Sequence, residues 1–119
     1  MNIVDSSAWL EYLSGSPRSI HFAEPIEATG RLVVPVMVIY ELFKKIVRER
    51  GEQPALEVCG LLSQGQVVDV DAALAVSAAR FTLPLADSLI YATAQRFGAT
   101  LWTQDEHFAG LPNVRFFPK

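Results

Sequence analysis

The chain has 119 residues, with 10 Lys and Arg against 13 Asp and Glu, which gives a formal charge of −3, and 50% of its positions are apolar. This composition excludes intrinsically disordered and fibrous proteins, which are far less apolar or follow simple repeats. A chain of this length can bury roughly two-thirds of its unfolded surface, so we expect residues 1–119 to form a single domain.

The predicted elements alternate between short apolar strands and helices. In chain order they are a strand at 3–4, a helix at 8–13, a short or interrupted helix at 20–28, a strand at 32–34, helices at 38–50 and 54–62, a strand at 66–70, helices at 72–81 and 86–97, a strand at 99–103, a loop or single turn at 104–110 and a strand at 114–117. The helix at 38–50 has the clearest pattern, because its apolar residues recur at 3.6-residue spacing and Gly51 supplies a stop. Pro25 indicates that the second helix is short or interrupted, and Asp71 is a suitable N-cap for the helix that follows it.

Strands that alternate with helices predict an α/β domain. The strands are continuous apolar runs without the alternation of a half-exposed strand. We therefore expect three layers, with a mostly parallel central sheet of four to five short strands and helices on both faces. Ligands bind such sheets beyond the carboxyl ends of the strands.

Four acidic residues lie near the predicted strand exits, and they are Asp5, Glu41, Asp87 and Asp105. If these exits share one rim, the carboxylates converge, and their repulsion raises their pKa values unless a cation neutralises them. Hard oxygen ligands in this number suit Mg²⁺ or Mn²⁺. Small hydroxyl residues accompany three of the acids, and we expect them to orient the carboxylates; they are Ser6, Ser7, Ser88 and Thr103.

Each acid also has a purely structural interpretation. Asp5 and Asp87 are suitable helix caps, and Asp105 can terminate a turn. Glu41 can form an ion pair with Lys45 one helical turn later. The joint pattern favours one site over four unrelated structural roles.

Four segments in this order and spacing carry a family resemblance: NIVDSS at 2–7, VIYEL at 38–42, LADSLIYATA at 85–94 and TQDEHF at 103–108. Together they resemble a PIN domain of the VapC toxin type, over essentially the whole chain. The resemblance implies a PIN-like fold and a Mg²⁺-dependent endoribonuclease. It also implies that the four acids form the metal site, that Thr103 is the hydroxyl that precedes the last Asp, and that the partners are a second copy of the chain and a small antitoxin protein.

Bound metal is required in this interpretation, because a bare acidic pocket repels an anionic phosphodiester. We assign Asp5, Asp87 and Asp105 to metal coordination, and Glu41 to a second metal or to orienting the attacking water as general base. Both a site with one metal ion and a site with two metal ions are compatible with the four acids. His21 and His107 are predicted to be surface residues, and His107 is the better candidate for a substrate contact.

A basic strip follows Glu41 on the same helix. Roughly 100° per residue places Lys44, Lys45 and Arg48 within about 60° of Glu41, where they can contact RNA phosphates. An ordinary solvated helix face is an equally good explanation. The excess of acidic residues does not exclude RNA binding. Of the 13 acidic residues, four belong to the predicted site, which leaves 9 acidic against 10 basic residues in the rest of the chain.

Other functions remain as alternatives. The chain can be a PIN nuclease that is not a toxin, or a PIN-like module that binds metal or RNA without cleavage. A receiver-like signalling domain fits less well, because it needs an acidic pair after the first strand, where Asp5 stands alone, and a Lys after the last strand. Trp9, Tyr12, Leu13 and Phe43 form an apolar set that is more typical of a core than of an interface.

The sequence predicts no membrane segment. The longest apolar run, residues 32–40, contains Pro35 and is far shorter than the ~20 residues that span a bilayer. The N-terminal residues MNIVD lack the basic segment of a secretory signal, so we expect an intracellular, cytoplasmic protein. Cys59 has no disulfide partner and is predicted to be a small buried apolar residue.

Overall fold

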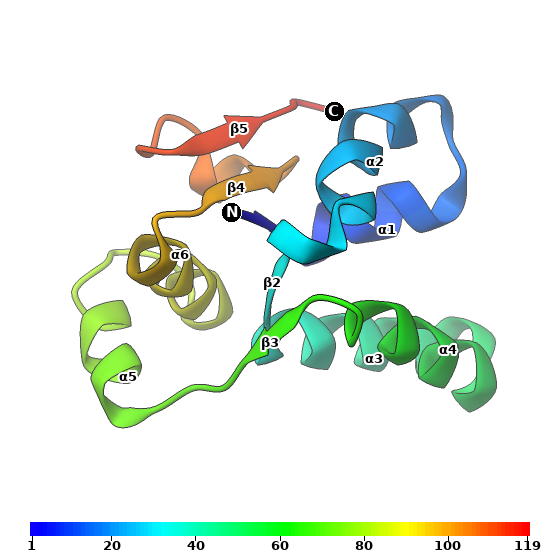
Figure 1. Cartoon of the computed structure of the whole chain (residues 1–119), viewed down its shortest axis with the longest axis horizontal. Coiled ribbons are helices and arrows are strands. Elements are labelled where there is room, and N and C mark those ends of the chain that lie inside the picture. The colour runs from blue at the N-terminus through cyan, green and yellow to red at the C-terminus, as the bar shows by residue number, and fades with distance from the viewer.

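Five short strands form the centre of the computed structural model, which describes all residues 1–119 (Figure 1). They are β1 (Asn2–Val4), β2 (Val33–Pro35), β3 (Gln66–Val68), β4 (Thr100–Thr103) and β5 (Val114–Phe116). β1, β4 and β5 form one sheet in the order β1-β4-β5, and β2 pairs with β3. A single bridge between Asn2 and Leu32 connects the two sheets. Every pair is parallel, so the predicted α/β class with a parallel sheet is confirmed.

Six α-helices surround the strands. They are α1 (Ser6–Ser14), α2 (Ile20–Glu27), α3 (Val36–Arg50), α4 (Glu52–Leu62), α5 (Ala72–Ala78) and α6 (Leu85–Phe97), with 3₁₀ turns η1 (Pro17–Ser19), η2 (Thr29–Arg31) and η3 (Glu106–Phe108). In Figure 1, α5 and α6 lie on one side of the strands, and α1 and α2 lie on the other. No helix combines the length and the apolar character that a membrane crossing requires.

The helix boundaries follow local chemistry. Asp5 caps α1 through its side chain, and Gly15 ends the same helix in the left-handed conformation with φ 69°. Gly51 ends α3, as predicted, with φ 94°. The helix predicted at 72–81 is shorter, because the backbone N–H groups of Arg80 and Phe81 turn back to carbonyls only three residues earlier.

The core lies between the strands and their covering helices. Its largest fully buried side chains include Trp9, Phe22 and Phe108. Trp9 is therefore a core residue, as predicted, and its predicted companions Tyr12, Leu13 and Phe43 pack against the core as half-buried residues. Cys59 is also only half-buried, so its predicted full burial is wrong. It lies on α4, which covers the edge of the core.

Candidate metal centre

Asp5 follows β1 directly and is buried, with only 2% of its surface exposed. Its Oδ1 accepts hydrogen bonds from Ser7 Oγ (2.9 Å) and from the backbone nitrogen of Ala8 (3.2 Å), and its Oδ2 accepts one from Thr103 Oγ1 (2.9 Å). Burial, with a smaller contribution from the charge of Asp105, raises the pKa of Asp5 to about 7 despite these three bonds. The carboxylate is therefore fully ionised near neutral pH only when a cation compensates its burial.

Asp87 lies in the first turn of α6 and is 9% exposed. Its Oδ2 lies 2.7 Å from Nδ1 of His107. Burial raises the pKa of Asp87, the hydrogen bond with His107 opposes this shift, and the charge of Asp105 adds to it. Asp87 is not the helix cap that the sequence suggested, because Pro84 takes the N-cap position and α6 begins two residues before Asp87.

Asp105 and His107 lie on the turn that follows β4. Asp105 caps η3, and its Oδ1 accepts a 2.9 Å hydrogen bond from the backbone nitrogen of His107. The same oxygen lies 3.3 Å from Nδ1 of His107. The backbone nitrogen of Asp105 donates to Thr103 Oγ1 at 2.9 Å. The hydrogen bond with Asp87 is the largest factor that raises the pKa of His107, followed by the charge of Asp105.

Glu41 reaches the same region from α3 and is half-buried. Its Oε1 accepts a 3.0 Å hydrogen bond from Ser6 Oγ at the start of α1. Burial raises the pKa of Glu41, the Ser6 bond lowers it, and the charges of Asp87 and Asp105 raise it again.

The structure thus brings together the four acids that the sequence singled out, which we call the acidic cluster: Asp5, Glu41, Asp87 and Asp105. The charge of Asp105 raises the pKa of each of the other three. No Lys or Arg forms an ion pair with any member. Ligand atoms of Asp87, Asp105 and His107 all lie within 4.8 Å of one another. Several hard oxygen donors that no Lys or Arg neutralises fit a divalent cation.

A model of the PIN domain family matches residues 3–114. The chain belongs to the PIN domain family. A search of curated proteins gives no match.

Solved structures share the fold of this PIN domain. A toxin–antitoxin complex from Klebsiella pneumoniae superposes with a TM-score of 0.82 at 20% identity, over 100% of both chains. DNA-bound VapBC from Salmonella typhimurium gives 0.76 at 19% identity, over 99% of this chain and 98% of that one. Mycobacterium tuberculosis VapC20, a toxin that cleaves the sarcin-ricin loop, gives 0.74 at 21% identity, over 97% of this chain and 99% of that one.

The hydroxyl residues of this PIN domain divide into those that touch the acidic cluster and one that does not. Ser7 and Thr103 donate to Asp5, and Ser6 donates to Glu41. Ser88 instead donates to the backbone carbonyl of Leu85 at 2.7 Å. The expectation that Ser88 orients a carboxylate is therefore wrong, because its own helix offers a closer acceptor.

The basic strip, defined as Lys44, Lys45 and Arg48, lies beside Glu41 on α3. It lines an open cavity of about 350 Å³ together with Ser6, Leu10, Tyr40 and Glu41. Lys45 pairs with Glu49 at 3.0 Å. The alternative pairing of Lys45 with Glu41 is therefore absent, and Glu41 instead accepts the hydrogen bond from Ser6.

The sequence did not predict two contacts at or beside the site, one made by His107 and one made by Gln104. His107 was expected at the surface, and 57% of its side chain is exposed, yet Nδ1 lies within the acidic cluster. Gln104 is buried between Thr103 and Asp105, where its Oε1 accepts two hydrogen bonds from Arg18, at 3.0 and 2.7 Å. The two-residue spacing of Asp105 and His107 was the available signal for the first. Nothing in the sequence pairs Gln104 with Arg18, which is 86 residues away.

Proposed function

We propose that this PIN domain is an endoribonuclease that depends on Mg²⁺, with Mn²⁺ as an alternative, and that it is the toxin of a toxin–antitoxin pair. The observation that carries the proposal is the convergence of four carboxylates that no Lys or Arg neutralises. Family membership and the likeness to VapBC structures support it.

The residues of the acidic cluster divide into three roles. Asp87 and Asp105 are the nearest candidates to hold the cation, since their oxygens share one small space with His107. Asp5 completes the set, and hydrogen bonds from Ser7 and Thr103 hold its carboxylate in place. A divalent cation bound there offsets the repulsion between the carboxylates and a phosphodiester and lowers the pKa of a water that it coordinates.

Glu41 is proposed to orient the attacking water. Its Oε1 is fixed by Ser6, and its raised pKa makes it a better proton acceptor than an ordinary surface carboxylate. It lies at the edge of the acidic cluster, next to the basic strip. A general base at this boundary stands between the proposed metal ligands and the proposed substrate path.

The basic strip is proposed to bind RNA phosphates. Its three side chains line the same cavity as Glu41, so a backbone that crosses this cavity would reach the acidic cluster. Tyr40 is 56% exposed on the same cavity, and Lys44 Nζ lies 5.5 Å from its ring centroid. An exposed aromatic ring beside basic groups offers a stacking surface for an unpaired base.

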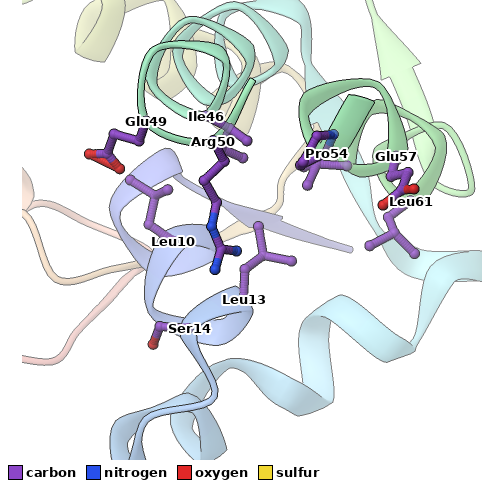
Figure 2. A pocket seen from close by; sticks show the side chains of 10 residues that line it. Leu10, Leu13, Ser14, Ile46, Glu49, Arg50, Pro54, Glu57 and Leu61 are labelled. Atoms are coloured by element: carbon purple, nitrogen blue, oxygen red, sulfur yellow. The ribbon is translucent and has the colours of Figure 1, made fainter. Parts of the chain in front are cut away.

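We propose an antitoxin as the protein partner and an apolar groove as its binding place. The groove, of about 470 Å³, lies between α1, α3 and α4, and its apolar side chains are Leu10, Leu13, Ile46, Pro54, Val58 and Leu61 (Figure 2). Arg50 reaches from α3 toward α1 (Figure 2), and Glu49 and Glu57 border the groove. A helix with apolar residues on one face and charges of both signs at its edges suits these walls. One similar structure, from Klebsiella pneumoniae, is a toxin–antitoxin complex.

The assembly proposals are tested by measuring molar mass by light scattering. The predicted homodimer gives twice the chain mass for the isolated protein, and co-expression with the antitoxin gives a complex in which the groove is covered. A Leu13→Glu variant that still dimerises but no longer binds the antitoxin supports the groove as the antitoxin site. Loss of the dimer in this variant would assign the groove to a second copy of the chain.

Cleavage is tested by mapping new RNA 5′ ends after brief expression of the wild type, with Asp105→Asn as the inactive control. New ends confined to one RNA class and absent from the control support a carboxylate-dependent endoribonuclease. Arrested growth in the wild-type culture alone supports the toxin role. Identical maps, together with no cleavage of total RNA by the purified protein in Mg²⁺ or Mn²⁺, would reject cleavage in favour of a binding module.

A further inference from the structure

His107 contributes a nitrogen atom to a group of oxygen donors. Its Nδ1 lies 2.7 Å from Oδ2 of Asp87 and 3.3 Å from Oδ1 of Asp105. One imidazole nitrogen is therefore shared by two carboxylates that come from different elements, α6 and the turn after β4. An isolated ion pair on a surface would join the imidazole to only one carboxylate.

The spacing of these atoms matches that of neighbouring ligands around one cation. Adjacent ligands of an octahedral ion with bonds of about 2.1 Å lie about 3 Å apart. The two distances from Nδ1 fall on either side of this value, and all three ligand atoms lie within 4.8 Å of one another. A cation can therefore replace the shared proton with little movement of the side chains.

The position of the imidazole is set by the same turn that sets Asp105. Asp105 Oδ1 accepts the backbone N–H of His107, and Thr103 Oγ1 accepts the backbone N–H of Asp105. The ring is therefore held over the acidic cluster by the backbone. Since 57% of the side chain is exposed, Nε2 can carry the ring proton in contact with water when Nδ1 binds a metal.

We propose that Nδ1 of His107 is a direct ligand of the cation held by Asp87 and Asp105, and that it favours Mn²⁺ and other first-row transition ions over Mg²⁺. This inference rests on the proposed function, because it requires the acidic cluster to bind a cation. Mg²⁺ binds oxygen donors almost exclusively, whereas transition ions accept imidazole nitrogen. A site built from carboxylates alone has no such preference for nitrogen-binding ions.

The test is pulsed EPR of Mn²⁺ bound to the full-length protein, which detects nitrogen in direct contact with the ion. We expect a ¹⁴N coupling that is replaced by a ¹⁵N coupling in protein labelled with ¹⁵N-histidine. His107→Asn, which removes the imidazole and keeps a polar side chain, should lose the coupling. His21→Asn, which alters the other histidine of the chain, retains it.

Metal preference gives a second readout that does not depend on RNA cleavage. Competition of Mg²⁺ against bound Mn²⁺, followed by the EPR signal of free Mn²⁺, measures the ratio of the two affinities. We expect His107→Asn to lower the preference for Mn²⁺ by at least about tenfold, because loss of a group that only orients a ligand already weakens metal binding by about 10–100-fold.

The outcomes separate this inference from the proposed function. If Mn²⁺ binds in an Asp105-dependent way but the wild-type protein shows no histidine coupling, His107 is not a ligand and the metal site stands. A coupling that persists in His107→Asn also overturns the inference. If wild type and Asp105→Asn bind Mn²⁺ equally weakly, the metal site itself is rejected.

Discussion

Thr103 Oγ1 donates a 2.9 Å hydrogen bond to Oδ2 of Asp5, although the two residues lie 98 positions apart in the chain. The parallel pairing of β1 with β4 places Val4 opposite Trp102. Asp5, which directly follows β1, therefore lies beside Thr103, the last residue of β4. The same hydroxyl accepts the backbone N–H of Asp105. One side chain thus links the first acid of the cluster to the last.

Thr103→Val tests this link, because valine keeps the shape and removes the hydroxyl. We expect RNA cleavage to fall by about 10–100-fold, since groups that orient metal ligands have effects of this size. The free energy of unfolding should also fall by about 1–3 kcal/mol, because buried polar groups lose their partner. Thr103→Ser, which restores the hydroxyl, should recover most of the activity. Full activity in Thr103→Val would show that Asp5 needs no such support.

Asp105→Asn should lower RNA cleavage by more than about 100-fold in saturating Mg²⁺, because it removes one of the proposed direct ligands. The matched control is Glu106→Gln, which removes the same charge from the neighbouring exposed residue and should leave the rate unchanged. The measurement is the single-turnover rate on a defined RNA. Equal losses in both variants would indicate a general charge effect.

Asp5 makes the metal-free protein sensitive to pH. Because burial raises its folded-state pKa from 3.8 to about 7, the folded state holds this proton more tightly than the unfolded chain does. The contribution of Asp5 to stability is therefore greatest below about pH 4 and is lost as the pH rises to about 7. Asp5→Asn removes this loss, so in EDTA at pH 8 the variant should be more stable by as much as about 4 kcal/mol.

Urea unfolding in EDTA at pH 5 and pH 8 measures this effect. Wild type should lose stability between the two values, whereas Asp5→Asn should change much less. Saturating Mn²⁺ should restore the stability of the wild type at pH 8 and should leave the stability of the variant almost unchanged. Parallel pH profiles for the two proteins would mean that Asp5 is ionised at little cost in the folded state.

The basic strip should control RNA affinity rather than the chemical step. In an Asp105→Asn background, Lys44→Glu and Arg48→Glu should weaken RNA binding and lower the slope of log K against log salt by about one for each lost phosphate contact. Arg31→Glu is the matched control, because Arg31 is exposed on η2 just before β2, at the end of that strand opposite to Glu41. If all three variants weakened RNA binding equally, the change in net charge alone would explain the result and the basic strip would have no special role.

Asp71 and Arg96 supply a stability test away from the acidic cluster. Two 3.0 Å hydrogen bonds from Arg96 are the main reason why the pKa of Asp71 falls to about 2. Asp71→Asn can still cap α5, where Asp71 accepts the backbone N–H of Leu74, but it loses the ion pair. We expect a slightly lower Tm at pH 7 and unchanged RNA cleavage. Because the folded-state pKa is depressed, the difference should shrink as the pH falls from about 4 to 2.

The sequence by itself determined the order of the helices and strands, and it singled out the four acids of the acidic cluster as candidates for one site. Apolar periodicity and residues such as Asp5, Gly51 and Asp71 act over a few positions, so their effects can be predicted without tertiary contacts. The parallel sheet followed from the same local patterns, because buried strands that alternate with helices have few other ways to pack.

Only the tertiary structure decided which side chains meet. Glu41 accepts from Ser6 rather than pairing with Lys45, and His107 turns Nδ1 into the acidic cluster although most of its ring is exposed. Local spacing carries no information about partners that are 20 to 98 residues apart. Those contacts arise when strand pairing and helix packing bring the ends of β1, β4, α3 and α6 to one place.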